Sequence, residues 1–468
     1  MVQTTGTTLL PMNTRVGNIA KAVLLSCALL ALTACGGGGG YGVVGGPKTY
    51  TVGGMVTGLT GSGLVLRDNG GDSLSVSASG TFTFATAVPS GMAYSVTVYA
   101  QPTSPNLNCA VTNGSGTVTN TNVTTVVVVC VPVGRFAYVT DLNATAVSAF
   151  TINSSSGALT AAPGSPFATG VGPISVAVDP SGKFLYVANN GESTVSAYTI
   201  NSGTGALTAA PGSPFGTGTA PRSVIVHVSG KFAYVANGSD NTVSAYTINA
   251  TTGALTTVAG SPFATGVAPF SVAVDPSGKF AYIANNSDNT VSAYTINSTT
   301  GALAAVAGSP FAAGNHPISV SVDPVGKFAY VANSGDTTVT AYTINSSSGA
   351  LAAVAGSPFA AGVGPNSVTV DASGNFAYVA NFTANTVSAY MINGVTGALA
   401  AVAGSPFPTG AQPASVSVDP SGKFAYIANE GDATVAAYTI NAATGALTVV
   451  AGSPFAAGVT PTSIIVSK

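Results

Sequence analysis

The feature that most constrains the fold of this chain is an internal repeat that begins near residue 134 and continues to the C-terminus. Seven Gly-Ser-Pro-Phe blocks follow one another at a constant spacing of 48 residues, and they end at Phe167, Phe215, Phe263, Phe311, Phe359, Phe407 and Phe455. A marker tyrosine and a marker proline recur with the same period, at Tyr138, Tyr186, Tyr234, Tyr282, Tyr330, Tyr378 and Tyr426 and at Pro173, Pro221, Pro269, Pro317, Pro365, Pro413 and Pro461. A fixed period of this length indicates a repeat architecture in which each copy forms one structural unit.

Each copy contains four short segments with the alternating, β-branched character of strands. In the copy that follows Pro173, these segments begin at Ser175, Lys183, Thr194 and Gly205. Four strands per copy and seven copies predict an all-β protein whose main part is a seven-bladed β-propeller. A solenoid is the alternative, but a solenoid needs capping repeats, and the sequence contains none.

The phase of the repeat predicts how the ring closes. The repeat begins at Gly134 with the pattern of a second strand, and it ends after Pro461 with the pattern of a first strand. We therefore expect the C-terminal strand to complete the N-terminal blade of a propeller that spans residues 133–468. Closure of this kind removes the open sheet edges that make such sheets prone to association.

The blades resemble those of the lactonase-type seven-bladed propellers, the group named after 6-phosphogluconolactonase and related to the YVTN-type surface-protein propellers. The resemblance rests on the segments Lys-Phe-Ala-Tyr-Val-Ala-Asn, Thr-Val-Ser-Ala-Tyr-Thr-Ile-Asn, Thr-Gly-Ala-Leu and Gly-Ser-Pro-Phe-Ala, and it covers about residues 134–468. It implies the propeller fold, and it implies lactone hydrolysis as one activity to expect. It is more specific for fold than for activity, because one fold supports many functions.

Residues 49–132 do not share the repeat. Alternating segments and clusters of Gly, Asn and Asp turn residues predict a small β-sandwich domain that precedes the propeller. This region contains Cys109 and Cys130, which we expect to form a disulfide in an oxidising compartment. Two cysteines without a nearby histidine do not make a typical zinc site.

Residues 1–35 have the pattern of a secretory signal. Arg15 and Lys21 precede an apolar run of eleven residues, 22–32, which is too short for a permanent membrane-spanning helix. The sequence Leu-Thr-Ala-Cys that ends at Cys35 resembles a bacterial lipobox. The resemblance implies cleavage before Cys35 and attachment of lipid to its sulfur, and a plain signal peptide with an unrelated cysteine is the alternative.

The segment 36–48 begins with five glycines and is expected to form a flexible tether. Together with a lipidated Cys35, it predicts an exported lipoprotein anchored to a membrane of the bacterial cell envelope. The protein would face either the periplasm or the cell surface.

Composition and motifs exclude several classes of function. The chain has 12 basic and 14 acidic residues, a net charge of -2 and no basic run, so nucleic acid is not an expected partner. The sequence also lacks the Gly-x-x-x-x-Gly-Lys-Ser/Thr, His-Glu-x-x-His and Cys-x-x-Cys motifs. We therefore expect no nucleotide, no other cofactor and no bound metal ion.

The candidate site residues are those that break the repeat. They flank the marker prolines, which we expect at the top mouth, defined as the end of the central channel where the first strands begin. Five of them carry useful chemistry, namely Arg222, Phe270, His316, Asn366 and Gln412. His316 is the candidate general base and Arg222 the candidate anion-binding or catalytic cation. The sequence thus predicts a ligand site at this mouth.

A set of acidic residues recurs six residues after the marker tyrosine in five blades, as Glu192, Asp240, Asp288, Asp336 and Asp432. Because these residues are periodic, we expect them to cap the turn before the third strand. The alternative is an acidic rim that binds Ca²⁺, but the spacing between blades is expected to hold these carboxylates too far apart to share an ion.

Two functions remain open on this evidence. The favoured one is a lipid-anchored surface binding or scaffold protein whose mouth takes a glycan, a peptide or a small molecule, and near-identical blades suit multivalent contact. The alternative is a lactone hydrolase of the 6-phosphogluconolactonase-like type, which would use His316 and Arg222.

Overall fold

The computed structural model describes residues 46–59, 62–102, 107–132 and 135–467. The predicted signal peptide with Cys35, and most of the predicted tether, lie outside the described residues. The described residues form strands and turns without a helix. Accordingly, this part of the chain contains no helix with the length and apolar character needed to cross a membrane.

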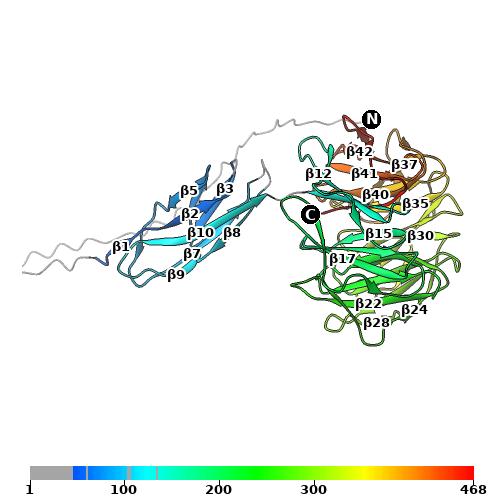
Figure 1. Cartoon of the computed structure of the whole chain (residues 1–468), viewed down its shortest axis with the longest axis horizontal. Helices are drawn as coiled ribbons and strands as arrows, with labels where there is room; N and C mark the ends of the chain where they lie inside the picture. Colours follow the sequence, from blue (N-terminus) through cyan, green and yellow to red (C-terminus); the bar gives the residue numbers. More distant parts are fainter. Residues whose placement is uncertain (1–45, 60–61, 103–106, 133–134, 468) are drawn as a thin grey trace, which may run out of the picture. The chain divides into compact units, whose positions relative to one another are not determined.

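The region before the repeat forms two four-stranded sheets around one apolar core (Figure 1, blue and cyan). The sheet orders are β5-β2-β10-β8 and β4-β3-β7-β9. The strands are β2 (Val52–Thr57), β3 (Leu64–Asp68), β4 (Asp72–Val76), β5 (Gly80–Thr83), β7 (Ala93–Ala100), β8 (Leu107–Thr112), β9 (Ser115–Thr117) and β10 (Val123–Pro132), and β1 (Thr49–Tyr50) pairs with β6 (Val88–Pro89). Alternate residues such as Val56, Leu66 and Val128 are buried in this core, as expected for strands with one solvated face.

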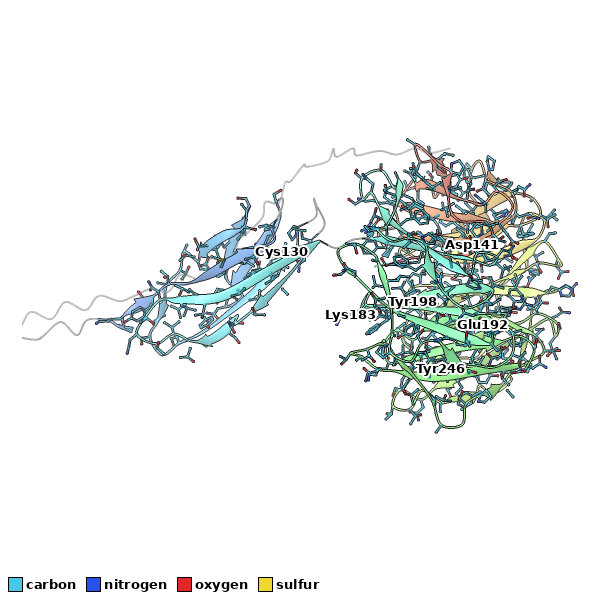
Figure 2. All side chains as sticks on the ribbon, in the orientation of Figure 1. Cys130, Asp141, Lys183, Glu192, Tyr198 and Tyr246 are labelled. Carbon is cyan, nitrogen blue, oxygen red and sulfur yellow. A yellow bond between two sulfur atoms is a disulfide. The ribbon has the colours of Figure 1, made fainter. Side chains whose placement is uncertain are left out.

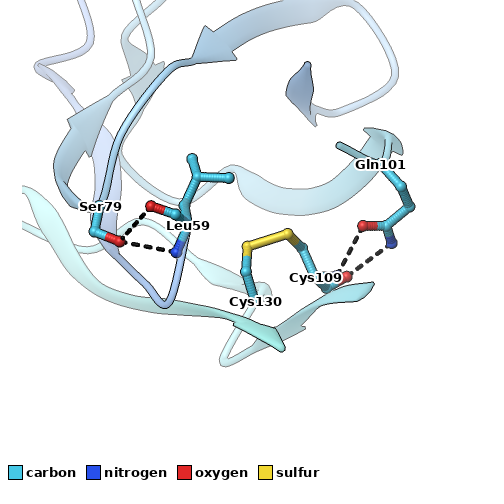
Figure 3. The surroundings of a disulfide bond; sticks show 5 residues. All are labelled: Leu59, Ser79, Gln101, Cys109 and Cys130. Carbon is cyan, nitrogen blue, oxygen red and sulfur yellow. Dashed lines mark hydrogen bonds between the residues drawn. A yellow bond between two sulfur atoms is a disulfide. The ribbon is translucent and has the colours of Figure 1, made fainter. Parts of the chain in front are cut away.

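The predicted disulfide joins the two sheet-forming strands β8 and β10. Cys109 and Cys130 stand opposite each other in the antiparallel register, and both are buried. The side-chain amide of Gln101 accepts a hydrogen bond from the Cys109 N–H at 2.8 Å and donates one to its carbonyl at 2.9 Å (Figure 3). The amide therefore satisfies both backbone groups of Cys109 on the side that β10 does not cover.

The repeat folds into seven antiparallel blades, coloured green to red in Figure 1. The first complete blade contains β15 (Pro173–Val178), β16 (Phe184–Asn189), β17 (Thr194–Ile200) and β18 (Leu207–Ala209), and the short β19 (Phe215–Gly216) pairs back onto β17. The blades β20–β24, β25–β29, β30–β34, β35–β39 and β40–β44 repeat these bounds at successive intervals of 48 residues. The first strands of neighbouring blades contact one another in order around the ring, so they surround the central channel.

Both chain ends of the propeller build the seventh blade. It contains β11 (Phe136–Asp141), β12 (Ala146–Ile152), β13 (Leu159–Ala161) and β14 (Phe167–Ala168), and the C-terminal β45 (Pro461–Val466) pairs antiparallel with β11. The predicted closure is therefore confirmed. Asp141, labelled in Figure 2, stands where the other blades carry Asn, and its carboxylate accepts hydrogen bonds from the backbone N–H groups of Val459 and Thr460. These hydrogen bonds hold the loop that leads into β45 in place.

The marker tyrosines join each blade to the next. All seven are fully buried, and each hydroxyl donates to the carbonyl of the glycine between the third and fourth strands of the following blade, at 2.9–3.1 Å. The last bond, from Tyr426 to Gly157, returns to the closing blade. Gly253 shows why glycine recurs here, because its φ is +75° and an added Cβ would lie 2.5 Å from the ring of Phe184.

Deleting residues 461–468 tests the closure. The deletion removes the buried Ile464 and Val466 and leaves β11 as an open edge, and each such side chain contributes about 1.5–3 kcal/mol. We expect a melting temperature at least about 10 °C lower and aggregation through the new edge. Calorimetry and gel filtration measure both effects, and an unchanged melting temperature would contradict this closure.

Replacing Tyr282 with Phe tests the bonds between blades. The substitution removes the hydrogen bond to the Gly349 carbonyl at 3.0 Å and leaves a buried acceptor unpaired, which costs about 1–3 kcal/mol. Denaturant unfolding measures this loss. The matched control is Tyr99→Phe, because Tyr99 is 61% exposed, and an equal loss in both variants would argue against a specific role for the bond.

Candidate functional site

A cavity of about 330 Å³ lies at the top mouth, among the first residues of the seven first strands. A periodic ring of seven serines lines it, namely Ser175, Ser223, Ser271, Ser319, Ser367, Ser415 and Ser463. In six of the seven blade pairs, the serine Oγ accepts a hydrogen bond from a backbone N–H of the next first strand at 3.1–3.3 Å. These serines belong to the frame of the channel, and each hydroxyl retains a proton to donate.

A β-bulge in every first strand brings one residue that breaks the repeat into the cavity. In β20 (Pro221–Val226), Pro221 pairs with Asn237 and Ser223 pairs with Ala236, so Arg222 has no partner across the ladder. Such a bulge redirects the side chain of the extra residue. The residues brought into the cavity in this way are Ile174, Arg222, Phe270, Ile318, Asn366, Ala414 and Thr462.

Arg222 is the only cationic side chain among the described residues that line this cavity. It is half-buried, and its guanidinium carbon lies 5.0 Å from the ring centroid of Phe270. Burial lowers the pKa of this guanidinium, although an arginine side chain stays charged at neutral pH. Within the described part of the chain no carboxylate oxygen lies within 4.0 Å of it, so its charge is available to a ligand.

Glu430 is the only acidic side chain among the described lining residues. It follows β41 (Phe424–Asn429), and its backbone N–H donates to the Gln412 carbonyl at 2.9 Å. Burial raises the pKa of its carboxyl group, because a low-polarity surrounding disfavours the charged form. A carboxyl group of this kind can exchange a proton with a reacting group closer to neutral pH than an ordinary glutamate.

Two further lining residues complete the site. The Asn366 amide nitrogen donates to the Ala414 carbonyl at 2.7 Å, which fixes the side chain. Its Oδ1 has no hydrogen-bond partner in the part of the chain that the structure describes, so it can accept one. Phe382 occupies in its blade the position that Glu430 occupies in the next, four residues after the marker tyrosine. Neither Phe382 nor Glu430 was predicted from the sequence. The residue type at this position differs from blade to blade, and this departure from the repeat is the signal from which both could have been predicted.

His316 and Gln412 lie outside the cavity lining. Both precede a marker proline, both are exposed, and both have φ of 53°. The His316 ring instead lies beside its neighbouring blade, with Nδ1 3.4 Å from Asn286 Oδ1. The structure therefore brings Arg222, Phe270 and Asn366 together but does not bring His316 or Gln412 to them.

The periodic acidic residues hold loops in place. The carboxylates of Asp240, Asp288, Asp336 and Asp432 accept hydrogen bonds at 2.5–2.6 Å from backbone N–H groups two residues before the marker prolines. Within residues 46–59, 62–102, 107–132 and 135–467, no group of three or more His, Cys, Asp or Glu residues could hold a metal ion. These aspartates thus stabilise the top loops around the mouth.

Several solved structures share this architecture. A putative 6-phosphogluconolactonase from Bacteroides uniformis is 20% identical, with a TM-score of 0.63 over 71% of this chain and 99% of its own. One from Bacteroides fragilis is also 20% identical, with a TM-score of 0.62 over 72% and 98%. The periplasmic gluconolactonase of Pseudomonas aeruginosa is 17% identical, with a TM-score of 0.62 over 72% and 99%. At these identities the likeness concerns the fold.

No curated protein matches this sequence significantly. The sequence model of the family described as "Lactonase, 7-bladed beta-propeller" matches residues 73–313 and 311–467, which is most of the chain. The match agrees with the seven blades and with the resemblance found in the repeat. The chain is a member of the seven-bladed β-propeller lactonase family.

Proposed function

We propose that this protein hydrolyses a lactone in the cavity of the top mouth. The observation that carries the proposal is that one cavity of about 330 Å³ is lined both by a guanidinium, which has no ion-pair partner among the described residues, and by a carboxyl group whose pKa is raised by burial. A cavity of this volume suits a small organic molecule. Membership of the lactonase family supports the choice of a lactone over other small molecules.

In the proposed reaction, Glu430 acts as the general base. Its carboxylate accepts a proton from a water molecule as the water oxygen bonds to the carbonyl carbon of the lactone. The carbon–oxygen bond of the ring then breaks, and Glu430 returns the proton to the ring oxygen, which yields a hydroxy acid. Arg222 stabilises the negative charge that develops on the carbonyl oxygen.

A binding or scaffold role would use the same cavity without turnover. The low content of charged residues in the sequence favours the binding or scaffold role. Membership of the lactonase family and the two charged groups in the cavity favour hydrolysis. We also propose that the reaction takes place outside the cytoplasm, on a protein anchored through Cys35. The Cys109–Cys130 disulfide supports this location, because disulfides persist in oxidising compartments.

Substituting Arg222 and His316 one at a time shows which of these two candidate residues contributes to hydrolysis. We expect Arg222→Ala to lower kcat/KM for lactones about 100-fold or more, as for the loss of one oxyanion-stabilising donor. His316→Ala should change it less than about twofold, because Ala220 and Ala268 already adopt the same backbone conformation in other blades. Rates are corrected for spontaneous lactone hydrolysis. Loss of turnover in His316→Ala alone would place the active site elsewhere.

The pH dependence tests Glu430. A general base works deprotonated, so kcat/KM should fall as the pH drops through the raised pKa of Glu430, at a higher pH than for an ordinary glutamate. Glu430→Gln should lower kcat/KM about 10²–10⁴-fold and abolish this acid limb. Glu192→Gln is the matched control, because Glu192 is exposed and does not line the cavity. An acid limb that persists in Glu430→Gln would assign the base to another group.

A further inference from the structure

We propose that the lactone taken by the top mouth carries an apolar alkyl or aryl substituent, rather than a phosphate group or a set of free hydroxyl groups. This inference rests on the proposed function and names the substrate class of the same site. It is drawn from the order of side chains around the cavity, the charge of the cavity and the residues at its rim.

The lining residues that break the repeat divide the cavity into a mainly apolar arc and a mixed arc. Around the ring, Ile174, Arg222, Phe270 and Ile318 come from four consecutive blades, whose first strands are β15, β20, β25 and β30 (Pro317–Val322). Arg222 is thus flanked by apolar side chains, and its guanidinium packs against Phe270. The blades that follow contribute the polar Asn366, Thr462 and Glu430 and the apolar Phe382 and Ala414. Apolar side chains therefore line the cavity on both arcs, and a ligand that fits them has a large apolar part.

Several polar groups of the cavity are engaged with the protein itself. Thr462 Oγ1 lies 2.9 Å from Thr140 Oγ1 and donates to the Pro173 carbonyl at 3.2 Å. The Asn366 amide nitrogen is bonded to Ala414, and most of the ring serines accept backbone N–H groups but keep an O–H group to donate. A polyhydroxylated ligand needs acceptors as well as donors, and each of its hydroxyl groups that faces no acceptor would lose a hydrogen bond to water on entering. Covering the half-buried Phe270 and Ile318 with an apolar group is instead favourable.

The charge of the cavity argues against a phosphate group. A phosphate monoester carries about 1.5–2 negative charges at neutral pH, and proteins bind it with clustered cations and bidentate arginines. Here one cation, Arg222, shares the cavity with one carboxyl group, Glu430, and no lysine is among the described lining residues. When Arg222 and Glu430 are both ionised, their two charges cancel. The cavity then has no net charge, which suits an uncharged substrate.

Exposed valines stand at the same end of the first strands as the cavity. Two residues before the marker proline, four blades that alternate along the chain carry valines that are 45–64% exposed, namely Val171, Val267, Val363 and Val459. They stand in the loops that lead into the first strands, on a chain that is otherwise rich in Ser, Thr and Asn. A substituent too long for the cavity can meet one of these valines rather than water alone.

The experiment compares lactones and a non-hydrolysable analogue on the same protein. We expect kcat/KM for δ-decalactone to exceed that for glucono-δ-lactone and for 6-phosphogluconolactone about tenfold or more, the effect of a few buried methylene groups. Calorimetry gives a second readout that needs no turnover. The lactam 6-pentylpiperidin-2-one should bind about tenfold tighter than 6-phosphogluconate.

A matched pair of variants locates the apolar contact. Ile318→Asn places in β30 the residue that β35 carries at the same position, Asn366, so the fold has a precedent for it. We expect this variant to lose about tenfold in kcat/KM for δ-decalactone and in affinity for the lactam. Val325→Asn is the control in the same blade, because Val325 is 80% exposed in the turn at the opposite end of β30. Melting temperatures verify that both variants fold.

The outcomes separate the two proposals. Faster hydrolysis of glucono-δ-lactone or 6-phosphogluconolactone, or tighter binding of 6-phosphogluconate than of the lactam, overturns the apolar substrate class and leaves lactone hydrolysis standing. Tight binding of the lactam that depends on Ile318, without hydrolysis of any lactone, overturns the hydrolase and supports an apolar ligand. Absence of both binding and turnover overturns both.

Discussion

The structure depends on the hydrogen bond that each buried marker tyrosine donates to a glycine carbonyl of the next blade. Seven such bonds run around the ring, and the bond from Tyr426 to Gly157 joins the last complete blade to the closing one. Each bond requires a buried hydroxyl, a glycine with positive φ and a phenylalanine packed against that glycine. Because one geometry is repeated seven times, Tyr, Gly and Phe recur at a constant spacing, and β45 is needed for the geometry to repeat at the closing blade.

A frame built in this way confines chemistry to the positions that it leaves unspecified. The residue after the marker proline is one, since the bulge directs it into the cavity and away from the ladder. The residue after the second strand is the other, and it supplies Phe382 and Glu430. These two positions in seven blades make about fourteen in all. The same fold can therefore offer different side chains to different ligands at these positions, while the bonds between blades stay unchanged.

Periodicity explains which features could be predicted from the sequence. The blades and the closure by β45 depend on spacing and phase, which are visible in the chain itself. The Cys109–Cys130 pair was predicted separately, from the two cysteines of residues 49–132 and an oxidising compartment. The lining of the cavity was predicted only in part, because residues on either side of a marker proline look equivalent in sequence. The bulge directs Arg222, which follows Pro221, into the cavity. His316 precedes Pro317 in a backbone conformation with positive φ, and its side chain is exposed outside the cavity. Glu430 was missed because it reaches the mouth from another strand.

The electrostatics of the cavity also bear on how a product would leave it. Hydrolysis turns an uncharged lactone into an anionic hydroxy acid. In the proposed reaction Arg222 would attract the new carboxylate, but Glu430, once it had returned its proton to the ring oxygen, would repel it. In the partly desolvated cavity this repulsion is stronger than it would be in water, so a site with both charges holds the product less tightly than a site with Arg222 alone. The carboxyl group that activates water would thus also favour turnover by weakening product binding.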